Sequence, residues 1–379
     1  MKTDHFIAGY FLVMQTQNKS KIYSIQALRA LAAILVVIYH SRQSAYVFQE
    51  KYGFGGTLFF DFAPFKDIGA IGVDIFFVIS GFVMSYITWN TARSYTSIGS
   101  FLIKRLIRIV PTYWFYTLLT VFIIFSGKIF LGKTDFFDVI RLSDIIYSLF
   151  FIPYHPPEGR LAPVLAVGWT LNYEIYFYVL VAIGLLFRWR IATIGLAIYF
   201  IGSVIASFFY SSSYAFWPMA TNPIVLEFYY GILICILYKK FDGINRYFGC
   251  LSLIITSLIL FYWFYYFPSY QYRVIFFGLP AAGIVLWFLS LENHKSFFSS
   301  SLCQSLGDSS YSLYLSHFTF LPLIGNIVGF IFSKIGIASL IYLDIYIPVI
   351  IISTIILGHI LYYIIERPLN KYVSRILLK

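Results

Sequence analysis

Charged residues are scarce in this sequence. Asp, Glu, Lys and Arg make up 11% of its 379 residues, against about 25% in soluble domains. Hydrophobic residues account for 60% of the chain. Apolar runs long enough to cross the hydrocarbon core of a bilayer follow one another almost end to end. The shortage of charge therefore excludes a soluble globular protein, leaves no room for a soluble domain, and predicts a polytopic membrane protein.

Cysteine and the usual site motifs are also scarce or missing. Cys235, Cys250 and Cys303 are isolated in or beside apolar segments, so they predict neither a disulfide framework nor a zinc site. The sequence contains no Gly-rich phosphate loop, His-Glu zinc motif or nucleophile elbow. We therefore expect no metal. The first 20 residues carry Lys2 and Lys19 without a small-residue cleavage site, so we expect no cleaved signal peptide.

Positive charge exceeds negative charge, with 27 Lys and Arg against 16 Asp and Glu. The basic residues are spread through short loops between apolar runs, which is typical of the positive-inside bias of membrane proteins. We therefore expect contact with membrane lipids and no nucleic-acid partner.

The apolar periodicity predicts an all-α helical bundle with about ten transmembrane helices. These spans are expected near residues 24–42, 68–89, 101–126, 164–187, 191–209, 222–238, 249–267, 273–290, 311–333 and 338–365. An even number puts both termini on one side, and the excess of Lys and Arg in one set of loops makes that side the cytoplasm. The expected organisation is a cytoplasmic N-terminal segment (1–23), a transmembrane domain (24–367) and a cytoplasmic tail (368–379).

The first span carries Arg29 and His40 within its apolar sequence. They are eleven positions apart, so on a helix they share nearly one face and lie roughly 16 Å apart along the axis. Taken alone, Arg29 fits a snorkelling arginine and His40 fits an interfacial histidine. Ionisable groups at membrane depth cost about 2–3 kcal/mol or more and usually mark a functional path. Together the two residues predict a site reaching through the membrane, with His40 as a general base.

Two carboxylates in the spans are further candidates. Asp74, in GAIGVDIFFVISGF, sits among small residues that permit close helix packing, and it could orient His40 or pair at the outer interface. Glu174, in VGWTLNYEIYFYVL, shares a polar stripe with Thr170 and needs a partner at membrane depth, so we predict a functional role. Four other polar residues fit helix–helix hydrogen bonds as well as ligand binding: Glu227, His317, Asp344 and His359.

A basic turn lies at the cytoplasmic mouth of the third span, in FLIKRLIRIVPTYW. Lys104, Arg105 and Arg108 could signal topology and contact anionic lipids. Alternatively, they could clamp the phosphates of a cytoplasmic donor, because Arg105 and Arg108 are neighbours on a helix.

Six blocks of the sequence, in order, resemble the membrane-bound acyltransferase type 3 family. This family comprises bacterial O-acyltransferases that modify surface polysaccharides, O-antigen, peptidoglycan and Nod factors. The blocks are ALRALAAILVVIYH, GAIGVDIFFVISGF, FLIKRLIRIVPTYW, VGWTLNYEIYFY, LGDSSYSLYLSH and ERPLNKY.

The resemblance implies roles for several residues. Arg29 and His40 correspond to the family's signature pair, with His40 as catalytic base. Arg105 and Arg108 correspond to a basic motif that meets acyl-CoA. Glu174 is the carboxylate of a block that here reads Trp-Thr-Leu instead of Trp-Ser-Leu. In many relatives an arginine stands three residues before the equivalent of Glu227, and here that position is Ile224. This departure speaks against Glu227 as half of a charged pair.

The expected function is transfer of an acyl group, with acetyl the commonest in the family, from cytoplasmic acyl-CoA to a hydroxyl of an extracytoplasmic or lipid-linked polysaccharide. The expected location is the bacterial inner membrane. Glu174 or Asp74 would set the tautomer of His40, and either direct attack or a transient acyl-histidine is compatible with the sequence. Relatives often carry an added extracytoplasmic esterase-like domain, so we expect this chain to act alone or with a separate partner enzyme. A transporter or flippase for a lipid-linked saccharide or small solute is the alternative, since buried Arg, His and Glu also fit a permeation path.

Overall fold

The computed structural model describes residues 21–56, 67–91, 94–131, 140–155, 162–266, 269–294, 298–336 and 343–378. Most of the expected N-terminal segment, residues 1–20, lies outside this part of the chain.

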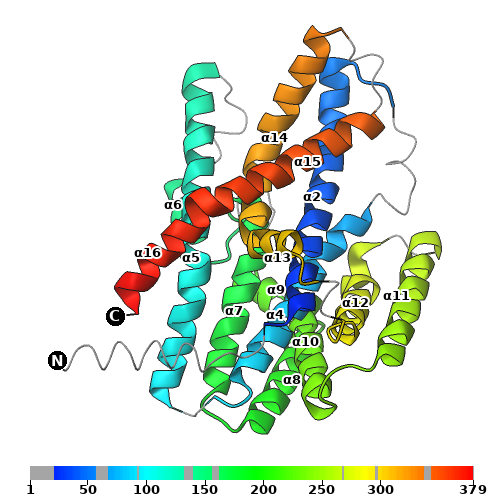
Figure 1. Cartoon of the computed structure of the whole chain (residues 1–379). Helices are drawn as coiled ribbons and strands as arrows, with labels where there is room; N and C mark the ends of the chain where they lie inside the picture. The colour runs from blue at the N-terminus through cyan, green and yellow to red at the C-terminus, as the bar shows by residue number, and fades with distance from the viewer. Residues whose placement is uncertain are drawn as a thin grey trace, which may run out of the picture.

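The described residues form a bundle of helices without β-strands (Figure 1). The longer helices are α2 (Tyr23–Tyr52), α4 (Ile71–Thr88), α5 (Tyr95–Leu131), α7 (Trp169–Gly184), α8 (Trp189–Ala206), α10 (Leu226–Lys240), α11 (Arg246–Tyr266), α12 (Leu279–Ser290), α14 (Ser310–Lys334), α15 (Leu343–Leu361) and α16 (Arg367–Leu377). Short helices are α6 (Leu142–Leu149), α9 (Phe216–Ala220) and α13 (Ser301–Asp308), with 3₁₀ turns η1 (Ile68–Ala70), η2 (Ala166–Gly168), η3 (Pro223–Val225) and η4 (Tyr270–Tyr272). Two π-helical turns, η5 (Val274–Gly278) and η8 (Tyr362–Glu366), precede α12 and α16.

Each of the ten predicted spans coincides with a helix. Eight helices in the described part of the chain are long and apolar enough to cross a membrane. The helices at the other two predicted spans are shorter: α10 has 15 residues, and the segment Val274–Ser290 has 17. The polytopic all-α class is confirmed, while the orientation of the termini stays a prediction.

Helix α4 lies at the centre of the bundle and packs against α2, α7, α10 and α12. Two glycines make its crossing with α10 very close. A Cβ on Gly81 would lie 2.0 Å from the carbonyl oxygen of Phe228, and one on Gly231 would lie 2.1 Å from that of Val78. Small residues of this kind let membrane helices approach backbone to backbone.

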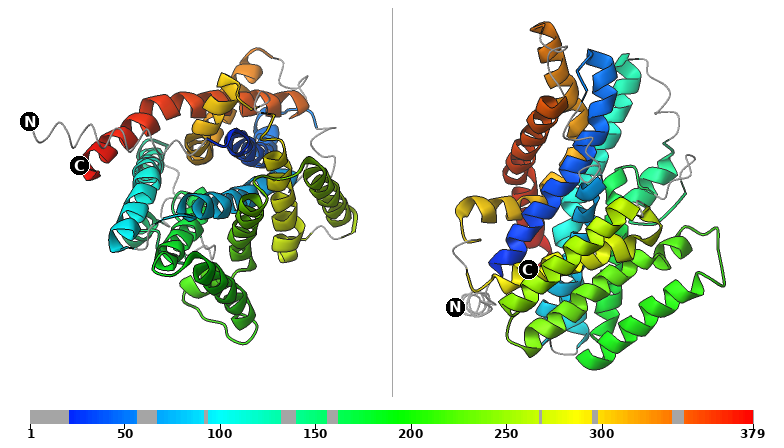
Figure 2. Two further views of the ribbon diagram at one scale, coloured as in Figure 1. Left: turned by 60° about the horizontal axis from the view of Figure 1, so that its bottom comes forward. Right: turned by 90° about the vertical axis from the view of Figure 1, so that its right-hand side faces the viewer.

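The same device fixes α4 against α2. A Cβ on Gly72 would lie 2.3 Å from the carbonyl oxygen of Ala32, and one on Gly69 would lie 2.4 Å from that of Leu35. This contact anchors the stretch of α2 between Arg29 and His40. Helix α14 packs along another side of α2 (Figures 1 and 2), so α2 is held between α4 and α14.

Candidate active site

A cavity of about 310 Å³ lies between α2, α4, α5, α7 and α14. Along α4 its lining runs from Ile87 to Val73, a distance of about 20 Å for fourteen helical residues. Its polar lining includes Lys21, Arg29, Arg108, Glu174 and Tyr178, and most of the remaining wall is apolar. The cavity therefore joins a cationic mouth to an apolar interior.

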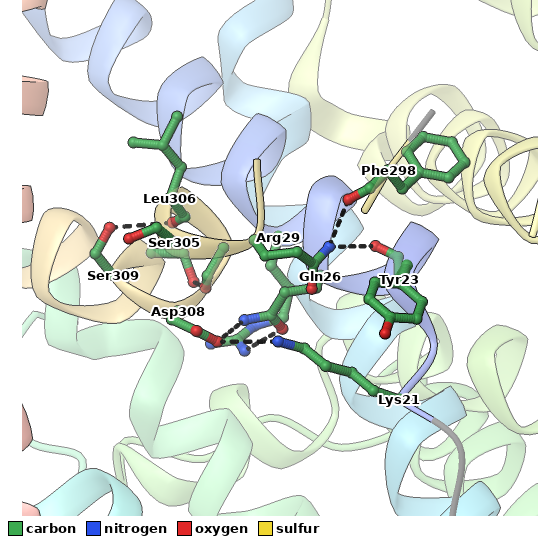
Figure 3. Close-up of polar contacts among 12 residues, drawn as sticks. Lys21, Tyr23, Gln26, Arg29, Phe298, Ser305, Leu306, Asp308 and Ser309 are labelled. Atoms are coloured by element: carbon green, nitrogen blue, oxygen red, sulfur yellow. Dashed lines mark hydrogen bonds and ion pairs between the residues drawn. The ribbon is translucent and has the colours of Figure 1, made fainter. Parts of the chain in front are cut away.

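Arg29 stands in the wall of this cavity and is held by a local network (Figure 3). Its Nη1 donates a hydrogen bond of 3.1 Å to Oε1 of Gln26. The Nε2 of Gln26 in turn donates to Asp308 at the end of α13, and Lys21 Nζ lies 3.8 Å from the same carboxylate oxygen. Because Gln26 links Arg29 to α13, the guanidinium is fixed at the cavity wall.

The three basic residues of α5 differ in their relation to the cavity. Arg108 lines it together with Arg29. Arg105 is partly buried beside Tyr178 and hydrogen-bonds with that side chain. Lys104 is exposed, and the described cavity lining does not include it. The structure thus brings Arg29, Arg108 and Arg105 together and leaves Lys104 at the periphery.

Glu174 lies with the arginines rather than with His40. Its Oε1 accepts a hydrogen bond from the hydroxyl of Tyr178, and it interacts electrostatically with Arg29 and Arg105. The expectation that Glu174 sets the tautomer of His40 is therefore wrong. The physical reason is that a carboxylate at membrane depth pairs with the nearest cation, and the cations line this end of the bundle.

Asp74 also has a different partner from His40. Arg273 donates to it twice, through Nε at 2.9 Å and Nη2 at 2.7 Å, and Asp74 is fully buried. Of its two predicted roles, the structure supports pairing and not orientation of His40. Glu227 is also fully buried and interacts electrostatically with Asp74 and Arg273. Glu227 thus has a cation nearby although Ile224 replaces the expected arginine.

His40 instead lies beside a second histidine, His317 on α14. The ring centroids are 5.2 Å apart with the planes inclined at 36°. His40 also hydrogen-bonds with the side chain of Gln43. His40 is half-buried, whereas His317 is completely buried. The pair therefore offers one accessible imidazole backed by an inaccessible one.

An aromatic partition separates the cavity from these histidines. Gly72 faces Ala32, so the inner end of the cavity at Val73 lies about eight residues, or roughly 12 Å, short of His40 along α2. Phe76 and Tyr314 line the cavity and contact each other edge to face at 5.7 Å, and Tyr314 also contacts His317 at 5.9 Å. Phe76 and Tyr314, called the partition below, stand between the two parts of the site.

Three residues of this region were not assigned a role from the sequence. Arg273 was predicted only as the first residue of a span. Glu366 belongs to the block ERPLNKY, and its buried carboxylate interacts electrostatically with Arg29 and Arg108. The block was the available sequence signal, and the structure adds a π-helical turn, a feature that often occurs at functional sites. His317 was marked by its depth in a span and as the last residue of the block LGDSSYSLYLSH. In the described part of the chain, no group of three His, Cys, Asp or Glu residues could hold a metal ion.

A membrane-spanning bundle with a cationic cavity mouth and two adjacent histidines is an integral membrane protein with an internal site. Residues 22–363 match the acyltransferase domain of the acyltransferase type 3 family. The match covers most of the chain, so the chain belongs to this family. The protein is therefore a membrane enzyme of the O-acyltransferase type.

Individual relatives agree with this assignment. The chain is 33% identical over 314 residues to the "Exopolysaccharide production protein ExoZ" of Rhizobium meliloti, covering 80% of this chain and 90% of the relative. It is 25% identical over 397 residues to the "Putative O-acetyltransferase SACOL0978" of Staphylococcus aureus, covering 92% of this chain. That alignment spans 57% of the length of the staphylococcal protein. No solved structure matches the chain.

Proposed function

We propose that this enzyme transfers an acetyl group from cytoplasmic acetyl-CoA to a hydroxyl of an extracytoplasmic or lipid-linked polysaccharide in a bacterial inner membrane. The observation that carries the proposal is the cavity, which joins a mouth containing Arg29 and Arg108 to an apolar interior that points toward His40. The chain belongs to an acyltransferase family, which favours acyl transfer over the alternative function of a transporter.

The cavity mouth suits the donor's phosphates. Guanidinium groups form strong, charge-assisted hydrogen bonds with phosphate oxygens, and Arg29, Arg105 and Arg108 gather at this end of the bundle. Glu174 and Glu366 neutralise part of this positive charge. The carboxylates therefore keep the arginines in place when no donor is bound, and the acyl arm would extend into the apolar interior.

His40 would remove the proton from the acceptor hydroxyl. As the new C–O ester bond forms, the C–S bond of the thioester breaks, and the proton passes through His40 to the departing CoA thiolate. General-base catalysis of this kind contributes about 10²–10⁴-fold. Because the partition separates the cavity from His40, Phe76 and Tyr314 must move, or the acyl arm must displace them, during turnover.

The acceptor class in this proposal follows from the named relatives. The rhizobial relative is named for exopolysaccharide production, and the staphylococcal relative for O-acetyl transfer. A polysaccharide hydroxyl satisfies both. A separate extracytoplasmic partner enzyme remains part of the proposal, as does contact with membrane lipids.

The test uses inside-out membrane vesicles containing glycan acceptors and acetyl-CoA labelled in the acetyl group. The native protein is compared with His40→Ala, and both are checked for equal abundance and thermal stability. We expect label in the glycan or lipid-linked fraction only with the native protein. Transfer by His40→Ala at the native rate would remove His40 as base. No transfer by the native protein, with acetyl-CoA or other acyl-CoAs, would refute the proposed function.

A further inference from the structure

His317 on α14 lies beside His40, the proposed base on α2. The rings of His317 and His40 are 5.2 Å apart between centroids. His317 has no exposed surface, whereas His40 retains some. An acceptor hydroxyl can therefore meet the exposed part of His40, whereas His317 is closed to it.

The hydrogen bonding of His317 defines its tautomer. Its Nδ1 lies 3.2 Å from the carbonyl oxygen of Leu313, one turn earlier on α14. A carbonyl oxygen can only accept, so Nδ1 carries the ring proton and Nε2 carries a lone pair. This Nε2 is buried and has no hydrogen-bond partner among the described residues. Leaving a buried acceptor unpaired is unfavourable, and His317 thus presents an unused proton-accepting nitrogen next to His40.

A carboxylate often supports a histidine base, but none of the contacts of His40 with the described residues is to a carboxylate. Glu174 is bound to Tyr178, and Asp74 is bound to Arg273. The described neighbours of the His40 ring are the side chain of Gln43 and the rings of Tyr39, His317 and Phe318. A full positive charge on His40 would be expensive at membrane depth. The amide oxygen of Gln43 can also accept a hydrogen bond, but His317 is the neighbour whose acceptor nitrogen is buried and has no partner among the described residues.

We propose that His317 is a positioning residue for His40: during turnover its Nε2, unpartnered among the described residues, accepts a hydrogen bond from one ring N–H of His40, and it thereby shares the positive charge that forms when the other ring nitrogen of His40 takes the acceptor's proton. This inference rests on the proposed function. The proton leaves the hydroxyl oxygen as that oxygen bonds to the acyl carbon. The ring nitrogen of His40 that faces the acceptor holds this proton while the C–S bond breaks, and then gives it to the CoA thiolate. The second imidazole thus takes the place of a carboxylate without adding a negative charge to the membrane interior.

The experiment compares four proteins in the vesicle assay: native, His317→Ala, His317→Gln and His359→Ala. His359 is the matched control, because it is a histidine in a span whose Nδ1 bonds with Ser309, away from His40. Rates at saturating acetyl-CoA, the KM for acetyl-CoA and the binding of labelled CoA are measured for each. Imidazole is added to His317→Ala, since the truncation leaves space for a free ring.

We expect His317→Ala to lower kcat about 100-fold, with the KM and CoA binding within about twofold of native. Imidazole should restore part of the rate. His317→Gln, whose amide reaches the position of Nε2, should retain more activity than His317→Ala. His359→Ala should leave the rate near native.

Two results would overturn the inference while leaving the proposed function intact. The first is a native rate in His317→Ala. The second is a loss of transfer in His317→Ala that is matched by an equal loss of CoA binding and is not relieved by imidazole, because that pattern indicates a structural role. Absence of transfer by the native protein would overturn the inference and the proposed function together.

Discussion

Arg273 and Asp74 form a two-pronged ion pair inside the bundle, with Nε and Nη2 donating to the two carboxylate oxygens at 2.9 and 2.7 Å. A third hydrogen bond runs from Nη2 to the carbonyl oxygen of Ala70 at 3.0 Å. The pair joins α4 to the π-helical turn before α12. Asp74 was a candidate partner for His40, but both of its carboxylate oxygens accept hydrogen bonds from Arg273. Asp74 therefore stabilises the helix bundle and does not orient His40.

Breaking this pair should destabilise the protein more than it slows chemistry. Removing one partner of a buried ion pair leaves an uncompensated charge and typically costs about 3–5 kcal/mol. We expect Arg273→Met and Asp74→Asn each to lower the melting temperature in detergent. The double variant should lose less than the sum of the two, since its members interact directly. Additive losses would show that the pair contributes no coupling.

The crossing of α4 and α10 should tolerate no side chain at Gly81. A Cβ there would lie 2.0 Å from the carbonyl oxygen of Phe228, so Gly81→Ala must push the helices apart. We expect a loss of at least about 3 kcal/mol, the upper end of the overpacking range. Gly195→Ala on α8 is the control, because nothing lies within 4 Å of its Cβ. That change should stabilise the helix by about 0.5–1 kcal/mol. Equal melting temperatures for the two variants would contradict the close crossing.

Donor binding should depend on Arg108 and not on Lys104. Arg108 lines the cavity, whereas Lys104 is exposed outside the described lining. A hydrogen bond to a charged group contributes about 1.5–3 kcal/mol, so Arg108→Ala should raise the KM for acetyl-CoA roughly 10- to 100-fold. Lys104→Ala should change it less than about twofold. The measurement is initial rate against acetyl-CoA concentration, and a larger effect of Lys104→Ala would place the phosphates elsewhere.

The partition should limit the size of the acyl group. Phe76 and Tyr314 line the cavity between its apolar interior and the histidine pair. Phe76→Ala removes a ring and enlarges this end. One extra methylene in a hydrophobic pocket is worth about 1–3 kcal/mol, so we expect kcat/KM for butyryl-CoA to rise at least tenfold relative to acetyl-CoA. An unchanged ratio would show that another surface sets the acyl length.

Much of the fold was predictable because lipid imposes simple constraints. The long apolar runs can only be helices in a bilayer, and all ten predicted spans coincide with helices. The number of helices long enough to cross the membrane was less predictable: eight of the described helices are, whereas α10, at one predicted span, has 15 residues. Gly69 and Gly72 were expected to permit close packing, and they do so against α2. Local composition carries this information directly.

The pairing of the polar residues was not predictable in the same way. Either Glu174 or Asp74 was expected to orient His40, with pairing elsewhere as the alternative for Asp74, but they bind Tyr178 and Arg273. His317 looked no more functional than His359. Asp74 and Arg273 are separated by 199 positions in the chain, and no local pattern connects groups so far apart. Side chains of this kind choose partners by proximity across helices, which depends on how the helices rotate and cross.

The sequence alone determined that the chain is a helical membrane protein, and it brought Arg29 and His40 onto one face of α2, because hydrophobicity and helical periodicity act locally. The tertiary structure alone decided which groups meet. It placed Glu174 and Glu366 where they interact electrostatically with Arg29, and it placed His317 beside His40. The physical reason is that an ionisable group inside a membrane must be neutralised by whatever the packing of other helices brings within reach.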